Sequence, residues 1–159
     1  MKLTHLDESG RARMVNVGEK PVTERTAVAE GAVKMSRGAF DAVAAQTVAK
    51  GDVLAVAEVA GTMGAKRTGE LIPLCHPLGL DLVEVEARLE PELPGVRVTA
   101  LAKASGKTGV EMEALTAVAV ACLTVYDMVK AIDRGMTIED VRLVSKTGGT
   151  RGDWRRTEA

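Results

Sequence analysis

Apolar and charged side chains alternate with a period of two most clearly over residues 82–89, where the apolar ones fall on one face. After a turn containing Pro and Gly at residues 91–95, the alternation returns over residues 96–102. The two runs predict a β-hairpin with one buried face. Two more strands are predicted over residues 23–34 and 138–146, which are rich in Val and other strand-forming residues.

Helices are predicted where capping residues precede runs that lack the two-residue period. Ser36 is a suitable N-cap for a helix that continues to Ala49, and Asp52 for a helix from Val53 to about Arg67. A long helix is predicted over residues 113–132. Without one helix, the order β-α-α-β-β-α-β is the βαββαβ order of a ferredoxin-like fold. That α+β fold has an antiparallel sheet with helices on one face.

The long helix has almost no polar face over residues 114–125. A helix that is apolar on all sides is buried on all sides. In a two-layer domain a second chain must cover one of these sides, so the sequence predicts an oligomer. The 159 residues are expected to form one domain, with flexible polar ends at residues 1–20 and 148–159.

Composition narrows the classes of partner. A net charge of −1 gives no reason to expect nucleic acid or an anionic membrane, and only three aromatic residues are available to stack on bases. No secretory signal or membrane-spanning apolar run is predicted, and the two cysteines lack the spacing of a disulfide scaffold. A cytoplasmic protein with neither nucleic acid nor membrane as partner is therefore expected.

Residues 71–78 hold Cys75 and His76 between two prolines, in a run too apolar for an ordinary loop. Such a pair is either tightly packed or part of a site. Adjacent residues rarely ligate one ion, and the other histidine is His5 in the polar N-terminal segment, so no metal site is predicted. Residues 105–108 (SGKT) resemble a phosphate loop, but Leu101 stands where that pattern needs glycine, so a simple turn is favoured.

Charged residues form two further constellations. Glu111 and Glu113 would point to opposite sides of a helix but share one side of an extended segment, and both alternatives stay open. Asp127 and Lys130 lie on one helical face. Roughly 21 Å of helix separates Glu113 from Asp127. A site that uses both constellations therefore needs a neighbouring subunit.

Basic residues at the ends of predicted elements would suit a phosphorylated ligand if they converge, and are ordinary solvated side chains if they do not. They are Lys50, Lys66, Arg67 and Lys146.

Six motifs, in order along nearly the whole chain, resemble the cyclic pyranopterin monophosphate synthase family, accessory protein C of molybdenum cofactor biosynthesis. They are residues 50–54 (KGDVL), 65–68 (AKRT), 71–78 (LIPLCHPL), 106–115 (GKTGVEMEAL), 126–130 (YDMVK) and 146–149 (KTGG).

The resemblance implies a lyase that converts 3′,8-cyclo-7,8-dihydroguanosine 5′-triphosphate, made by a radical-SAM GTP cyclase, into cyclic pyranopterin monophosphate and pyrophosphate. It also implies a ferredoxin-like hexamer, a trimer of dimers, with the active site at a subunit interface and no resident cofactor. Whether Mg²⁺ accompanies the triphosphate stays open.

Carried over motif by motif, the resemblance implies that Asp127 is the catalytic residue, with Lys130 beside it and Lys50 at a further pocket position. We predict that all three take part in catalysis. The resemblance places Leu74, Cys75, His76, Glu111, Met112, Glu113 and Lys146 in the substrate pocket, with Lys66 and Arg67 as further candidates. Proton transfer near neutral pH suits these groups, with Lys50 or Lys130 as general acid and Asp127 as base or orienting group. Two alternatives remain: a protein that binds the nucleotide without turnover, and an oligomer whose polar motifs only cap helices.

Overall fold

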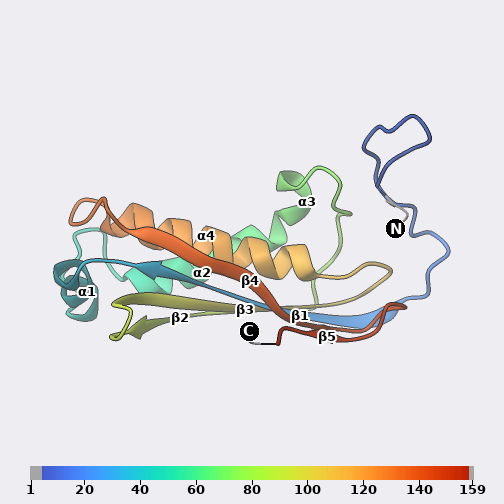
Figure 1. The fold of residues 1–159 in the computed structure, drawn as a ribbon. Coiled ribbons are helices and arrows are strands. Elements are labelled where there is room, and N and C mark those ends of the chain that lie inside the picture. Colours follow the sequence, from blue (N-terminus) through green and yellow to red (C-terminus); the bar gives the residue numbers. More distant parts are fainter. Residues whose placement is uncertain (1–4, 158–159) are drawn as a thin grey trace.

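The computed structural model describes residues 5–157, which form one antiparallel sheet with helices packed on one of its faces (Figure 1). The elements are β1 (Thr23–Lys34), α1 (Arg37–Ala44), α2 (Val53–Lys66), α3 (Thr68–Leu71), β2 (Leu82–Glu90), β3 (Gly95–Gly106), α4 (Glu111–Val129), β4 (Thr137–Thr147) and β5 (Trp154–Arg155). The strand order is β2-β3-β1-β4-β5, and every neighbouring pair is antiparallel. The prediction of a ferredoxin-like sheet with helices on one face is confirmed.

The core lies between the sheet and the pair α2 and α4. Alternate residues of β1 and β3 face it, and they are small: Ala29 of β1 is paired with Ala100 of β3, and both are buried. Small side chains let the helices approach the sheet and each other. A Cβ at Gly61 of α2 would lie 2.9 Å from the backbone oxygen of Ala117 in α4. Close packing is therefore the role of this glycine.

The first two helices begin where the capping residues predict. Ser36 Oγ accepts a hydrogen bond from Ala39 N (3.3 Å), and Asp52 Oδ1 accepts one from Ala55 N (3.1 Å). The predicted end of α1 is wrong, because the helix stops at Ala44 and Gln46 has a φ of 56°. The chain therefore leaves the helix through a left-handed residue other than glycine. The short α3 after Arg67 was not predicted.

Helix α4 spans Glu111–Val129 rather than residues 113–132. Ala114 N donates to the carbonyl oxygen of Val110 (3.2 Å), so both glutamates lie in the first turn. The helical alternative for Glu111 and Glu113 is thus correct, and their carboxylates lie where the helix dipole favours negative charge. At the other end, Lys130 is the C-cap.

No apolar run of membrane-spanning length was predicted from the sequence, but α4 meets that criterion. Within residues 5–157, it is the one helix long and apolar enough to cross a membrane by length and composition, with a mean hydropathy of 1.6. A buried core helix passes the same test. Here 56% of that segment is buried, against the sheet and α2.

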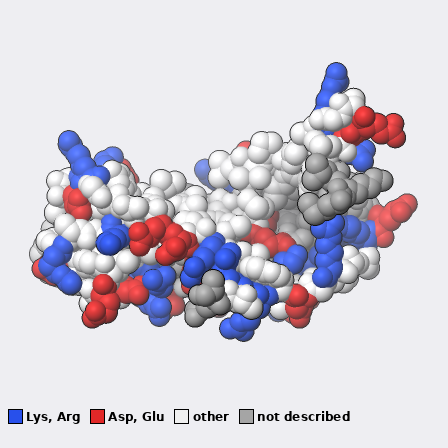
Figure 2. Space-filling view, in the orientation of Figure 1, with Lys and Arg blue, Asp and Glu red and all other residues white. Residues whose placement is uncertain are grey.

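The other side of the helical layer carries exposed apolar side chains. On α2, Val56, Val59 and Met63 are 43, 61 and 50% exposed, and Leu123 of α4 is 58% exposed. Figure 2 shows uncharged surface over much of this layer, whereas basic and acidic side chains mix along the sheet. The oligomer stays a prediction, and these side chains are what a partner would cover.

Both polar ends contain local structure. Leu6 and Ala12 form an isolated antiparallel bridge, and Lys107 Nζ donates to the backbone oxygen of Gly18 (2.6 Å). Lys107, the lysine of the SGKT segment, is thus used in a contact with the backbone of the N-terminal segment. Beyond β4, Trp154–Arg155 pairs with β4 as a strand that the sequence pattern missed.

Candidate active site

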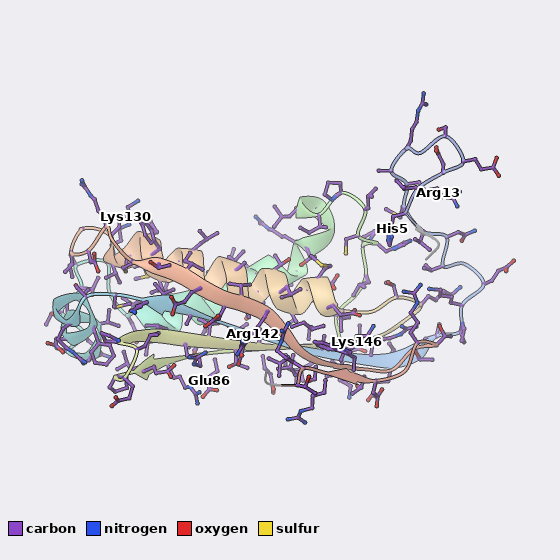
Figure 3. The ribbon with its side chains drawn as sticks, in the orientation of Figure 1. His5, Arg13, Glu86, Lys130, Arg142 and Lys146 are labelled. Atoms are coloured by element: carbon purple, nitrogen blue, oxygen red, sulfur yellow. The ribbon has the colours of Figure 1, made fainter. Side chains whose placement is uncertain are left out.

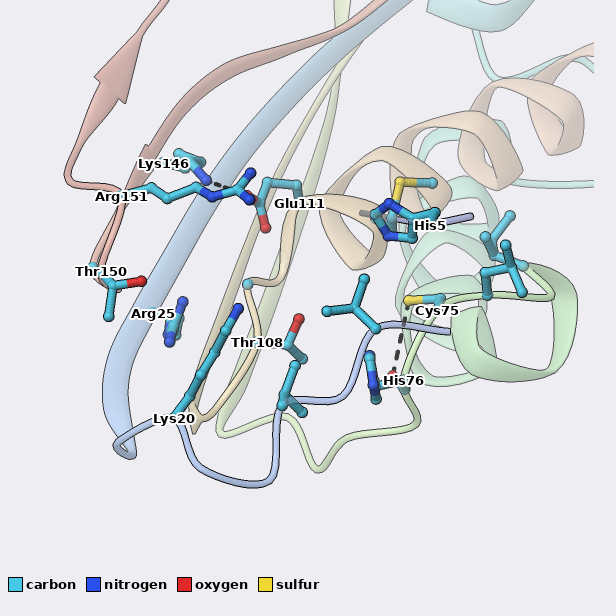
Figure 4. A pocket seen from close by; sticks show the side chains of 17 residues that line it. His5, Lys20, Arg25, Cys75, His76, Thr108, Glu111, Lys146, Thr150 and Arg151 are labelled. Atoms are coloured by element: carbon cyan, nitrogen blue, oxygen red, sulfur yellow. Dashed lines mark hydrogen bonds and ion pairs between the residues drawn. The ribbon is translucent and has the colours of Figure 1, made fainter. Parts of the chain in front are cut away.

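A pocket of about 470 Å³ lies between the N-terminal segment, the loop after α3, the start of α4 and the end of β4 (Figure 4). Its lining is formed by His5, Val15, Val17, Lys20, Arg25, Ile72, Leu74, Cys75, His76, Thr108, Gly109, Glu111, Met112, Lys146, Gly148, Thr150 and Arg151. Basic side chains gather on one side, and Cys75 and His76 lie on the other.

The proline-flanked run of residues 71–78 forms one wall of this pocket. Cys75 N donates to the backbone oxygen of Ile72 (3.1 Å), which closes a turn directly after α3. This turn directs Leu74, Cys75 and His76 to the pocket. The prolines on either side restrict the backbone around the turn, so the wall is stiff before any ligand binds.

Lys146 and Glu111 join two of the pocket's elements. Lys146 Nζ lies 2.7 Å from Glu111 Oε1, and both side chains are more than two-thirds buried. Lys146 is on β4 opposite Ala27, so it shares the helix-covered face of the sheet. The ion pair fixes the end of β4 against the first turn of α4 and leaves the ammonium at the pocket surface.

Arg25 is a site residue that the sequence interpretation missed. Its side chain is only 9% exposed, and neither Nε nor Nη2 has a hydrogen-bond partner among residues 5–157. A buried guanidinium without a partner is unfavourable unless an anion binds to it. The sequence did contain this information. Successive side chains of a strand point to opposite faces, so Arg25 lies on the same buried face of β1 as Ala27 and Ala29.

Glu113 lies behind the pocket wall. It is 3% exposed, its Oε1 lies 3.8 Å from Cys75 Sγ, and its Oε2 has no partner within the described chain. Burial raises the pKa of the Glu113 carboxyl. Two causes raise the pKa of the Cys75 thiol: the larger is its burial, and the next is the negative charge of Glu113. The thiol therefore stays protonated at neutral pH, which argues against Cys75 as a nucleophile.

A second cluster lies at the opposite end of α4. Asp127 accepts hydrogen bonds from Lys50 Nζ at Oδ2 and from Lys130 Nζ at Oδ1, each at 2.7 Å. The hydrogen bonds from both ammonium groups lower the pKa of Asp127 to about 2, and Lys130 has the larger effect. Figure 3 shows Lys130 at one end of the helix and Lys146 toward the other. The separation expected from the helical rise is present in the structure.

The predicted site residues thus fall into three groups. Leu74, Cys75, His76, Glu111, Met112 and Lys146 line the pocket, with Glu113 behind it, and Lys50, Asp127 and Lys130 form the distant cluster. Lys66 and Arg67 are exposed and line neither, so one chain does not bring them to the pocket.

Among the described residues, the pocket brings together four basic side chains and one acidic side chain. Lys20, Arg25, Lys146 and Arg151 face Glu111 alone among the acidic side chains of the lining. Within the described chain, no group of three or more His, Cys, Asp or Glu side chains is placed to hold a metal ion. This arrangement suits an anionic ligand with several phosphate groups.

Comparison with known proteins identifies the relatives of this chain. Cyclic pyranopterin monophosphate synthase of Cereibacter sphaeroides (strain KD131) is 62% identical over 150 residues, 94% of each chain. The protein of the same name from Brucella ovis is 57% identical over 153 residues, 96% of this chain and 93% of the relative. The model of the MoaC family matches residues 14–149, and with these relatives it shows that the chain belongs to the MoaC family.

Proposed function

We propose that this chain catalyses the reaction for which its relatives are named, the formation of cyclic pyranopterin monophosphate in molybdenum cofactor biosynthesis. The substrate is 3′,8-cyclo-7,8-dihydroguanosine 5′-triphosphate, and pyrophosphate is the second product. The observation that carries the proposal is the pocket in which Lys20, Arg25, Lys146 and Arg151 converge opposite the Cys75-His76 wall.

The basic side of the pocket fits the triphosphate. Closing a cyclic phosphate on the sugar displaces pyrophosphate, and negative charge builds up on the leaving oxygens. Fixed cationic donors stabilise that charge in a site shielded from water. Mg²⁺ carried in with the triphosphate would share this task without a protein-built metal site.

The Lys50–Asp127–Lys130 cluster supplies the proton-transfer groups. A carboxyl with a pKa of about 2 is a weak base, so Asp127 acts as the orienting group that holds two ammonium groups in place. Lys50 or Lys130 then acts as general acid during the opening and rebuilding of the guanine-derived rings. Lys50 is held most firmly, since it also donates to the backbone oxygen of Asp127 (2.9 Å).

Pocket and cluster come together in a homo-oligomer. They lie at opposite ends of α4, about 21 Å apart along the helix, so a second copy must bring its cluster to the pocket of the first. The exposed Val56, Val59, Met63 and Leu123 give a partner apolar surface to bury. The hexamer, a trimer of dimers, the supply of substrate by a radical-SAM cyclase and the cytoplasmic location follow from the family resemblance.

Turnover of the cyclised nucleotide by the purified protein tests the function. Pyrophosphate should be released in equal amount to the cyclic monophosphate formed. Binding of the nucleotide with no release of pyrophosphate would replace the enzyme by a carrier protein.

Subunit complementation tests the composite site. Asp127→Asn removes the cluster and Lys146→Met disables the pocket, so each variant alone should have little activity. After subunits exchange at random, about one quarter of the sites combine an intact cluster with an intact pocket. Activity of the mixture no higher than the mean of the two variants would show that the site is not shared in this way.

A further inference from the structure

We propose that Gly149 is a positioning residue for Arg25: its missing side chain lets the turn after β4 lie against the guanidinium and hold it toward the pocket. The inference deepens the proposed function, on which it rests for the identity of the phosphate-bearing ligand.

The contact is one that only glycine permits. Gly149 has a φ of 86°, and a Cβ built there would overlap Arg25 Nη1 and lie 2.9 Å from Cζ. Real Cβ atoms essentially never come this close to another heavy atom. Any other residue at this position must push the guanidinium away or move the turn.

The turn itself is fixed on both sides of Gly149. Gly148 has a φ of 87°, and a Cβ there would overlap the backbone oxygen of Glu24, the residue before Arg25. Gly148 N also donates to Asp153 Oδ1 (3.0 Å). Since the backbone of the turn is packed on β1 and tied by Asp153, the flexible arginine side chain is what gives way.

The buried state of Arg25 explains why its placement matters. Its Nε and Nη2 are buried without a protein partner in the described chain, so a phosphate bound beside them would satisfy donors that are otherwise unpaired. A guanidinium shifted by even about 1 Å would lose the two-pronged geometry that makes arginine–phosphate pairs strong. Gly149 thus affects the affinity for the anion through the position of Arg25, without contacting the anion itself.

The chain offers a matched control. Gly152 has a φ of 74°, similar to that of Gly149, but no atom lies within 4 Å of a Cβ built there. Gly152→Ala therefore carries the same backbone strain without the contact with Arg25. A difference between Gly149→Ala and Gly152→Ala reports the contact alone.

The test measures inorganic tripolyphosphate binding to the full-length protein by calorimetry. Gly149→Ala should weaken binding about tenfold or more, the loss of one charged hydrogen bond, whereas Gly152→Ala should stay within about twofold of wild type. In an Arg25→Ala background, Gly149→Ala should cause no further loss. In turnover of the cyclised nucleotide, Gly149→Ala should raise KM much more than it lowers kcat.

Several results would overturn the inference. They are wild-type protein that does not bind tripolyphosphate, equal losses in Gly149→Ala and Gly152→Ala, or the same loss from Gly149→Ala with and without Arg25. If Gly149→Ala does not fold, the Arg25→Ala/Gly149→Ala double variant must fold, because the clash has been removed. A protein that binds tripolyphosphate in this pattern but fails to turn over the cyclised nucleotide would refute the proposed function and leave the role of Gly149 standing.

Discussion

Lys50 Nζ donates to both the carboxylate (2.7 Å) and the backbone oxygen (2.9 Å) of Asp127, although 77 positions separate the two residues in the chain. The contact joins the loop before α2 to the last turn of α4. The side chains are about half exposed, so the contact contributes little to folding. Its value lies in holding an ammonium group in one place at the protein surface, where the proposed second subunit would present its pocket.

Asp127→Asn should lower kcat by about 10²- to 10⁴-fold, the usual contribution of groups that transfer or direct a proton. The amide cannot neutralise Lys50 and Lys130, so both ammonium groups lose their fixed positions. The unfolding temperature should change little, because exposed ion pairs stabilise weakly. Asp41→Asn, an exposed acidic residue of α1, is the matched control. A kcat equal to that of Asp41→Asn would remove Asp127 from the mechanism.

The low pKa of Asp127 should be visible by NMR at pH 4. In the wild type the carboxylate is ionised at this pH, since its pKa is about 2 against an ordinary 3.8. A depressed pKa means that the ion pairs are complete above the ordinary value and are lost only as the pH falls through about 2.

Lys130→Met removes the larger cause of the shift. Asp127 should then be partly protonated at pH 4, while Lys50→Met should have a smaller effect. Lys103→Met, which removes a lysine paired with Glu24, should leave the carboxyl signal unchanged. An Asp127 that titrates at its ordinary pKa in the wild type would contradict the cluster.

Glu113→Gln should stabilise the protein at pH 8 and leave its stability unchanged at pH 4. Burial raises the pKa of Glu113, so the folded state holds this proton more tightly than the unfolded state. That contribution is complete below the ordinary pKa and is lost as the pH rises through the raised value. Thermal unfolding at the two pH values measures the effect, and Glu92→Gln, at an exposed position, is the control. A lower unfolding temperature for Glu113→Gln at pH 8 would show that Glu113 has a charged partner in the assembly.

How much of this site could be predicted depended on whether the signal was local. The hairpin of β2 and β3 was predicted closely, because one face is buried and the two-residue period is complete. The start of α4 was missed, since its N-cap is Val110, which has no capping side chain. A lysine at the end of a helix or strand can point in any direction, and the sequence does not show which. Lys146 points into the pocket, and Lys66 does not. Arg25 was predictable from its inward phase, but the contact with Gly149 depends on a turn that no local pattern encodes.

Gly61→Ala should destabilise the protein by ~1–3 kcal/mol, the usual effect of overpacking a close contact. A Cβ at Gly61 would lie 2.9 Å from the backbone oxygen of Ala117 and 3.0 Å from Val85 Cγ1, so α2 would have to move away from α4 and β2. Gly38→Ala, in α1 with no atom within 4 Å of the new methyl group, should instead stabilise by ~0.5–1 kcal/mol through helix propensity. Denaturant unfolding of the two variants compares the same chemical change in a packed and an open position. Equal effects would mean that α2 and α4 are not held together by this glycine. The opposite signs expected here arise because the missing methyl group of Gly61 sets the distance between α2 and α4, the helix whose last turn carries Asp127 and whose C-cap is Lys130.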